Sequence, residues 1–178
     1  MARLDLHVHS VYSVDARLRP EDIIKEALKR GLDGVAVTDH GTVKGGLAVR
    51  RLSPPGFIAI PGVEAKTSRG ELLILFIEEE VRSRDPLEVI DEAREAGGLV
   101  VLPHPFDWMR GSKLEGLEEL VEKVDAIEVF NSRCPLLRLN IRAQRLAKSL
   151  NKPSTAGSDA HFSMEVGKAW TVVEANSA

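Results

Sequence analysis

Cysteine is almost absent from this sequence of 178 residues, in which Cys134 is the only one. One cysteine excludes an intramolecular disulfide and a Cys-rich zinc module, and it is consistent with a reducing compartment. No signal-peptide pattern opens the chain, and no apolar run reaches the roughly 18 residues that a membrane span requires. We therefore expect a cytoplasmic protein that does not associate with a membrane.

An excess of positive charge is also absent, because 24 Lys and Arg stand against 27 Asp and Glu, for a formal net charge of −3. A general nucleic-acid-binding protein usually carries a basic face, so this class is disfavoured, although a local basic patch could still bind a nucleic-acid end. The apolar content of 43% and the charged content of 29% are typical of a globular domain. The length predicts one domain over residues 1–178.

The sequence does contain a regular alternation of short apolar strands and amphipathic helices. We expect strands at 3–8, 33–37, 57–60, 71–77, 99–102, 126–130, 153–156 and 170–173, and helices at 19–30, 43–52, 85–97, 114–122 and 135–150. Residues 63–67 continue or follow the strand at 57–60, with a turn at Pro61-Gly62. This order predicts parallel β-α units with right-handed crossovers. No Gly-rich phosphate loop follows the first strand, which disfavours a dinucleotide-binding sheet and favours an α/β barrel.

The chain contains five histidines, and every one lies at or just after the end of an expected strand. His7 and His9 end the first strand two residues apart, so their side chains should point the same way. His40, His104 and His161 follow later strands. Because the carboxyl ends of parallel strands lie at one end of a barrel, we expect the five imidazoles to converge there.

Three carboxylates fall in similar positions, namely Asp39, Glu64 and Asp159. Taken singly, Asp39 or Asp159 could cap a helix, and Glu64 could lie in a solvated loop. Taken together with the histidines, they supply the ligand set that zinc, manganese and iron prefer. The sequence therefore predicts a shared metal site.

The motifs at these positions resemble those of the PHP family, named for polymerase and histidinol phosphatase. The resemblance is carried, in order, by His7-Val8-His9-Ser10, Thr38-Asp39-His40-Gly41, Gly62-Val63-Glu64, His104-Pro105 and Gly157-Ser158-Asp159-Ala160-His161. It implies a compact, distorted (β/α)7 barrel of the PHP type. It also implies two or three divalent metal ions (Zn, Mn or Fe) and, commonly, phosphoester hydrolysis.

The resemblance implies roles for individual residues as well. His7, His9 and Asp159 are similar to the ligands of a first metal. Glu64 is similar to a carboxylate that bridges to a second metal, and His104 to another ligand of that second metal. Asp15, His40 and His161 would hold a third.

One departure from the family pattern lies on the strand after Glu64. Many members carry a further histidine there, whereas Gly70-Glu71-Leu72-Leu73-Ile74-Leu75 has a leucine in its place. Glu128, Asn131 and Cys134 are candidates to complete the second metal site. Strand alternation puts Glu128 and Asn131 on opposite faces, so we expect that not all of them can serve.

The expected mechanism follows from the metal cluster. A water or hydroxide between two cations has its pKa lowered and becomes the nucleophile, while the cations neutralise phosphoryl charge. We therefore expect phosphoester hydrolysis through a metal-bridging hydroxide. His40 or His161, where no metal occupies it, would protonate the leaving group, and Asp39 would orient a ligand imidazole.

Four cations that follow strand ends are candidates for binding a substrate phosphate. Arg133 is the strongest, and Arg110, Lys44 and Lys113 are the others. The short loops predict an open pocket and a small phosphorylated substrate, such as a nucleotide, a sugar phosphate or an oligonucleotide terminus. Nothing in the sequence indicates a partner protein.

Two alternatives remain at this point. The first is a metal-dependent amide or lactone hydrolase, because barrel amidohydrolases also begin with His-x-His. These enzymes usually carry a bridging modified lysine, and no lysine here follows a strand end in that role. The second is a non-catalytic PHP-type barrel that acts as a subunit in nucleic-acid processing.

Overall fold

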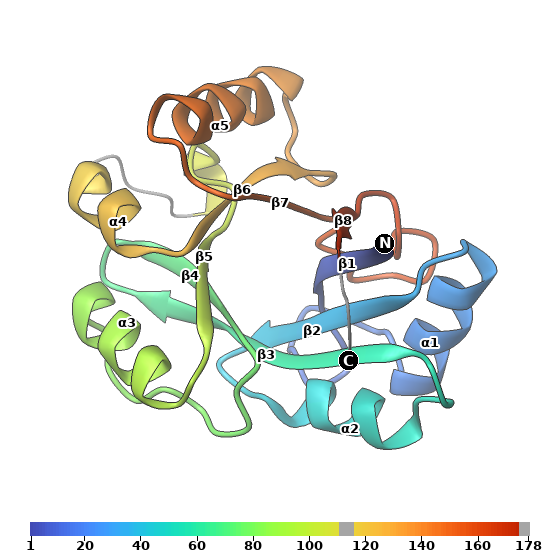
Figure 1. The fold of residues 1–178 in the computed structure, drawn as a ribbon. Helices are drawn as coiled ribbons and strands as arrows, with labels where there is room; N and C mark the ends of the chain where they lie inside the picture. The colour runs from blue at the N-terminus through green and yellow to red at the C-terminus, as the bar shows by residue number, and fades with distance from the viewer. Residues whose placement is uncertain (111–115, 175–178) are drawn as a thin grey trace.

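The computed structural model describes residues 1–110 and 116–174, and within them the strands form one sheet that curves into a nearly closed barrel (Figure 1). The strands are β1 (Ala2–Val8), β2 (Gly34–His40), β3 (Ile58–Thr67), β4 (Gly70–Leu75), β5 (Leu99–Leu102), β6 (Ala126–Asn131), β7 (Ser154–Gly157) and β8 (Thr171–Val173). Their spatial order is β7-β6-β5-β4-β3-β2-β1-β8. The expected distorted barrel of α/β class is confirmed.

Most neighbouring strands run parallel, as the alternation predicts, with β4 and β8 as the exceptions. β4 is antiparallel to both β3 and β5, and β8 is antiparallel to β1. The edge strands β7 and β8 meet through a side chain. The Ala156 amide donates to Thr171 Oγ1 at 2.8 Å, and that hydroxyl donates to the Ala156 carbonyl at 3.0 Å. Side-chain hydrogen bonds therefore take the place of a strand ladder at this seam.

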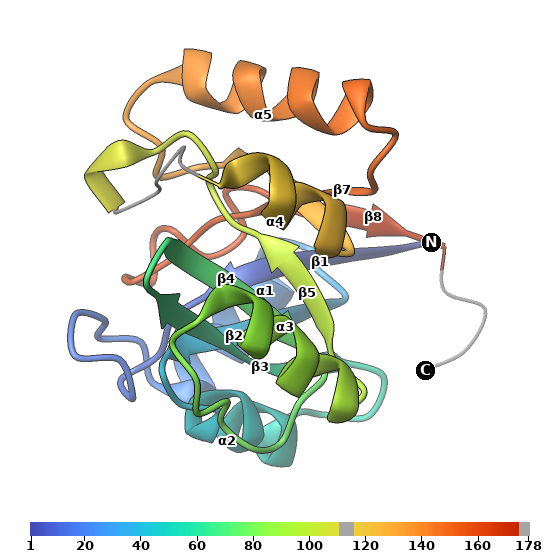
Figure 2. The ribbon, with the colours of Figure 1, turned by 90° about the vertical axis from the view of Figure 1, so that its left-hand side faces the viewer.

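The helices lie outside the barrel and cover its wall (Figures 1 and 2). They are α1 (Pro20–Lys29), α2 (Lys44–Leu52), α3 (Pro86–Glu95), α4 (Leu117–Lys123) and α5 (Leu137–Ser149), and a 3-10 turn spans Trp108–Arg110. Proline at the first position of α1 and α3 has no amide that would need a partner there. Asp85 caps α3 by accepting from the amides of Leu87 and Glu88. The expected start of a helix at Leu114 lies outside the described residues.

Apolar side chains fill both layers of this architecture. One buried cluster is built from strands alone and includes Leu4, Leu6, Leu73, Leu75 and Val101, which places it inside the barrel. Two further clusters join the outer strand faces to the helices. Within residues 1–110 and 116–174, no helix combines the length and the apolar character needed to cross a membrane.

The turn expected at Pro61-Gly62 is wrong, because β3 runs unbroken through both residues. Pro61 pairs with Val37 on β2, and Gly62 pairs with Leu75 on β4. Pro61 has no amide to donate, but its carbonyl still joins the sheet by accepting from the Phe76 amide at 2.8 Å. Glycine is needed beside it, since a Cβ on Gly62 would approach the Ile74 carbonyl oxygen within 2.5 Å. The unbroken strand carries Glu64 to the rim of the barrel.

Candidate metal centre

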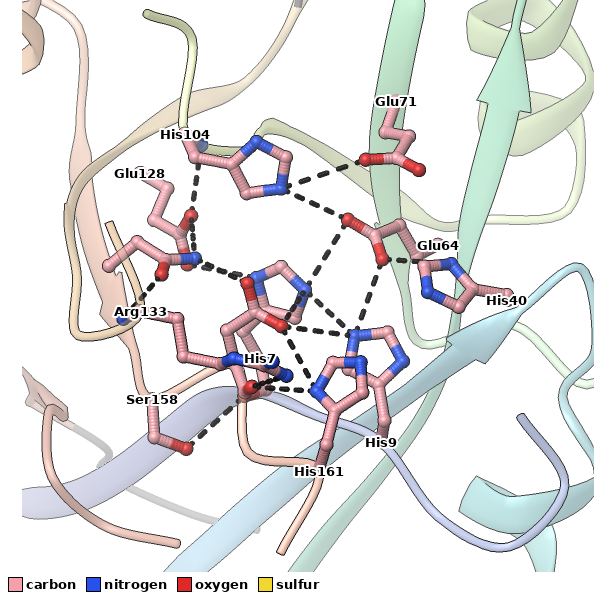
Figure 3. A network of polar contacts seen from close by, with 12 residues as sticks. His7, His9, His40, Glu64, Glu71, His104, Glu128, Arg133, Ser158 and His161 are labelled. Atoms are coloured by element: carbon pink, nitrogen blue, oxygen red, sulfur yellow. Dashed lines mark hydrogen bonds and ion pairs between the residues drawn. The ribbon is translucent and has the colours of Figure 1, made fainter. Parts of the chain in front are cut away.

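The carboxyl-terminal end of the barrel gathers the predicted histidines and carboxylates into one polar cluster (Figure 3). His7, His9, Glu64, His104 and Asp159 are each at most 3% exposed. They reach the cluster from β1, from β3 and from the segments that follow β5 and β7. We call the whole set the cage: His7, His9, Asp15, His40, Glu64, Glu71, His104, Asp159 and His161. A 220 Å³ cavity opens onto it.

The floor of the cage is formed by the paired histidines of β1 and by two carboxylates. His7 Nε2 and His9 Nε2 are 3.2 Å apart. Glu64 Oε1 lies 3.4 Å from His7 Nε2, and Glu64 Oε2 lies 3.3 Å from His9 Nε2. Asp159 Oδ1 is 3.8 Å and 3.5 Å from the same two nitrogens.

These spacings fit a shared cation. Around an ion with ligand bonds of about 2.1 Å, neighbouring donor atoms are about 3.0 Å apart in an octahedron and about 3.4 Å apart in a tetrahedron. The two imidazole nitrogens of the floor are 3.2 Å from each other and 3.3–3.8 Å from the carboxylate oxygens, so a small contraction would close these donors around one ion. Two facing imidazole nitrogens with carboxylates beside them are also the donor chemistry that Zn²⁺, Mn²⁺ and Fe²⁺ prefer.

A second group of donors lies toward β4 and β5. His104 Nε2 is 3.2 Å from Glu64 Oε1 and 3.8 Å from Glu71 Oε2. The other oxygen of Glu64 lies 3.1 Å from His40 Nδ1. Glu64 therefore extends toward both sides of the cage, as a bridging carboxylate must.

A third group surrounds Asp15, which is half exposed. Asp15 Oδ2 lies 3.3 Å from His40 Nε2 and 3.2 Å from His161 Nε2. Nitrogens of His9, His40 and His161 also lie within 4.8 Å of one another. The residues expected to hold a third metal are thus brought together at the outer rim, where solvent reaches them.

The backbone is specialised where the chain delivers two of these residues. His104 and Asp159 have positive φ angles of 26° and 57°, which non-glycine residues seldom adopt. Gly157 precedes Asp159, and a Cβ there would collide with the Cβ of His7. Close approach of the chain after β7 to β1 therefore positions Asp159 over the paired histidines.

Glu128 lies behind the cage and holds its members in place. His7 Nδ1 donates to Glu128 Oε1 at 3.0 Å, which fixes the tautomer and leaves Nε2 facing the cavity. Glu128 Oε2 accepts from the His104 amide at 2.9 Å and from Asn131 Nδ2 at 3.0 Å. Both oxygens of this fully buried carboxylate therefore have hydrogen-bond donors from the protein.

The expected separation of Glu128 and Asn131 onto opposite faces is wrong. Asn131 Nδ2 donates both to Glu128 Oε2 and, at 2.9 Å, to Asp159 Oδ2. An irregular register between Glu128 and Phe130 inserts a residue into β6 and turns both side chains to the same side. Cys134 lies in the loop after β6 and is partly exposed.

Asp39 is buried and contacts serines rather than an imidazole. Its carboxylate accepts from the Ser10 amide at 2.6 Å, from Ser10 Oγ at 2.7 Å and from Ser13 Oγ at 2.8 Å. Ser13 Oγ in turn accepts from the His40 amide at 2.9 Å and lies 3.3 Å from His9 Nδ1. Asp39 therefore acts on His9 and His40 through Ser13.

The charges within the cage shift the pKa values of its members. Burial opposes protonation of His7, but Glu128 and Glu64 raise its pKa to about 10. Burial likewise opposes ionisation of Glu64, yet His7 and His104 hold its pKa well below the usual range. Burial and the charge of Glu64 raise the pKa of Glu71 to about 7. The buried carboxylates Glu64 and Glu128 therefore favour positive charge at the position of the His7 imidazole.

Of the expected phosphate-binding cations, Arg133 lies beside the cage. It lines the 220 Å³ cavity, and its Nη1 is 3.5 Å from the Asp159 carbonyl oxygen. Lys44 begins α2 and is exposed. The side chain of Arg110 and the whole of Lys113 lie outside the described residues.

A groove of about 530 Å³ adjoins the cavity, and sequence reasoning did not identify its cations. The groove and the cavity share His40, Glu64 and Glu71, and the groove extends to Lys66, Arg82 and Arg84. Glu92 anchors this part of the groove by accepting from the amides of Arg82 and Ser83. Together, the two cavities provide space for a substrate larger than a single phosphate group.

Glu71 is the cage residue that sequence reasoning missed. It is the second residue of β4 and pairs with Lys66 of β3. The available signal was its place two residues before Leu73, on the strand that departs from the family pattern. A β3–β4 hairpin in the observed register puts Glu71 on the same face as Leu73, two residues nearer the rim.

Comparison with known proteins gives two family matches and a long relative. Residues 5–128 match the family described as the PHP domain, and residues 138–178 match one described as PHP-associated. An uncharacterized protein of Methanocaldococcus jannaschii is 37% identical over 174 residues, which cover 94% of this chain and 69% of that protein.

Solved structures show the same fold. A candidate metal-dependent phosphoesterase of Bifidobacterium adolescentis has a TM-score of 0.79 at 20% identity, over 94% of this chain and 92% of its own. An amidohydrolase of Chromobacterium violaceum with bound sulfate and no metal has a TM-score of 0.69 at 16% identity, over 94% and 91% of the two chains. At such identities these likenesses establish the barrel fold.

Proposed function

This chain belongs to the PHP family, and from that membership we propose that it is a divalent-metal-dependent phosphoesterase. Its proposed substrate is a small phosphate ester or a nucleotide-type molecule. The observation that carries the proposal is the cage itself, in which Glu64 lies within 3.4 Å of His7, His9, His40 and His104. An acid between four imidazoles is a suitable bridge between two cations.

Bound divalent cations would supply an activated water and would neutralise phosphoryl charge. The protein's own residues do the rest. Glu128 fixes the tautomer of His7 so that its Nε2 faces the cavity. Ser13, held by Asp39, takes the corresponding position beside His9 Nδ1. These contacts orient the nitrogen ligands before any substrate arrives.

Arg133 and the rim histidines are the proposed substrate-facing groups. Arg133 lines the cavity beside Asp159, where its guanidinium would bind a phosphoryl oxygen. His40 and His161 line the same cavity at the solvent side, within reach of a leaving group. We assign to them the delivery of a proton to the departing alkoxide when a cation does not occupy their nitrogens.

The experiment that tests the proposal begins with the metal content of the purified protein. Phosphate release is then measured with Mn²⁺, Zn²⁺ or Fe²⁺ on p-nitrophenyl phosphate, a phosphodiester analogue, nucleotides and short oligonucleotides. Metal-dependent release of phosphate, abolished by chelation, supports the proposal. Metal binding without turnover of any phosphate ester would contradict it.

The same assay separates the two alternatives. An amide and lactone panel is run beside the phosphate panel, because the fold is shared with a protein described as an amidohydrolase. Hydrolysis of amides but not phosphates would assign the chain to that chemistry. A protein that binds no metal would instead be a non-catalytic barrel, for which partners in nucleic-acid processing would be the next question.

A further inference from the structure

The cage differs in chemistry from one end to the other. At one end, His9, His40 and His161 bring nitrogen atoms within 4.8 Å of one another, with Asp15 beside two of them. We call this the imidazole-rich end. At the other end, Glu64 and Glu71 both approach His104 Nε2, at 3.2 Å and 3.8 Å. We call this the carboxylate-rich end.

Glu71 reaches the carboxylate-rich end because of strand direction. β4 runs antiparallel to β3, so the first residues of β4 lie at the rim where β3 delivers its last ones. Leu73, which pairs with Glu64, is 1% exposed and packs inside the barrel. Glu71 lies two residues nearer the rim on the same face, and its side chain is 15% exposed.

The carboxylate of Glu71 lies close to a second carboxylate, an environment that would bind a cation. Its carboxylate lies within 4.8 Å of donor atoms of Glu64 and His40, so two acids share one small space. Lys66 is its ladder partner and lines the adjoining groove. Among the ion pairs of residues 1–110 and 116–174, Glu71 is joined to His104 and to no lysine or arginine. A divalent ion held by Glu71 and Glu64, with His40 or His104 beside them, would relieve the repulsion.

We propose that Glu71 is a direct metal ligand. We also propose that the ratio of Zn²⁺ affinity to Mn²⁺ affinity is smaller at the carboxylate-rich end than at the imidazole-rich end. The inference rests on the metal-dependent function proposed above. Carboxylate oxygens suit Mn²⁺ and Mg²⁺, whereas imidazoles suit Zn²⁺ and Fe²⁺. Zn²⁺ binds most such sites more tightly than Mn²⁺, so the two ends are compared by this ratio and not by which ion binds more tightly.

The test counts bound ions and does not depend on turnover. Metal-free protein is titrated with Mn²⁺ and followed by electron paramagnetic resonance, and Zn²⁺ affinity is measured by competition with a chromophoric chelator. The variants are Glu71→Gln, which keeps the shape and removes the charge, and Glu71→His, which replaces the carboxylate by an imidazole. Glu79→Gln is the matched control, because Glu79 is an exposed acid in the loop after β4. Circular dichroism of each metal-free variant verifies folding.

We expect Glu71→Gln to weaken one equivalent of Mn²⁺ by about 100-fold, with the tightest Zn²⁺ equivalent changed less than about threefold. Glu71→His should weaken Mn²⁺ similarly while retaining or strengthening Zn²⁺ at that end. Glu79→Gln should match the wild type.

Two results would overturn the inference while leaving the proposed function intact. In the first, the wild type binds metal and Glu71→Gln binds the same number of Mn²⁺ ions with the same affinity, which would show that Glu71 is not a ligand. In the second, the variant weakens Mn²⁺ and Zn²⁺ by the same factor, which removes the preference. A wild-type protein that binds neither ion would instead refute the proposed function and this inference together.

Discussion

Replacing Asp39 should destabilise the fold and, through Ser13, weaken metal binding by the cage. The carboxylate is fully buried and accepts three hydrogen bonds, from the Ser10 amide, Ser10 Oγ and Ser13 Oγ. Hydrogen bonds to a charged acceptor contribute about 1.5–3 kcal/mol each. Alanine at this position would leave all three donors without their acceptor, for a sum of about 4.5–9 kcal/mol.

Water can enter the space that the Asp39→Ala variant leaves and recover part of that loss. We therefore expect the free energy of unfolding to fall by about 4 kcal/mol, a large share of the stability of a typical domain. In Asp39→Asn, an amide oxygen in the place of Oδ1 can still accept from the Ser10 amide and from Ser13 Oγ. The amide nitrogen, in the place of Oδ2, can donate to Ser10 Oγ. This variant should lose only about 1–2 kcal/mol.

Urea denaturation of the chelated proteins, followed by circular dichroism, measures both differences without a contribution from bound metal. Metal affinity is measured in parallel, and Asp39→Ala should lower it by about 10–100-fold because Ser13 no longer holds His9 and His40. A free energy of unfolding for Asp39→Ala within 1 kcal/mol of the wild type, or an Asn variant as unstable as the Ala variant, would refute this account.

Three further predictions concern the cage and its cavity. Glu64→Gln, which removes the charge shared by four imidazoles, should leave the circular dichroism spectrum intact and strip both metal and activity; a normal metal content would show that Glu64 does not bridge. Arg133→Ala should raise KM for phosphate esters with little change in metal content, and an unchanged KM would return this arginine to a surface role. Chelation should lower Tm by roughly 8 °C relative to protein with metal at about 100 times Kd, since such binding contributes about 2.7 kcal/mol; an unchanged Tm would mean that no cation is bound in the folded state.

Much of the cage was predictable from the sequence, because its histidines follow strand ends and a parallel barrel brings those ends together. His40, His104 and His161 come from distant segments and nevertheless meet within one cavity. Glu71 was not predictable by the same rule. It lies at the start of β4, and only the antiparallel direction of that strand brings its start to the rim. Strand direction is a property of the assembled sheet and leaves no trace in local periodicity.

Irregular strand register explains how one strand can serve both the apolar interior and the cage. Strict alternation along β1 would place Leu4, Leu6 and Val8 inside the barrel and both histidines outside. Between Asp5 and Val8, however, β1 advances three residues while β2 advances two. Leu6 consequently joins the interior cluster, Val8 packs on the outer side, and His7 and His9 turn inward.

The same device operates in β6, which advances three residues from Glu128 to Asn131 while β7 advances two. Glu128 then holds His7 while Asn131 holds Asp159. In both strands the extra residue lies at the level where the apolar interior ends and the polar cage begins. A regular β1 could not place Leu6 in the interior and His7 in the cage together, so the change of register is what allows a small barrel to be packed below and ligand-rich above.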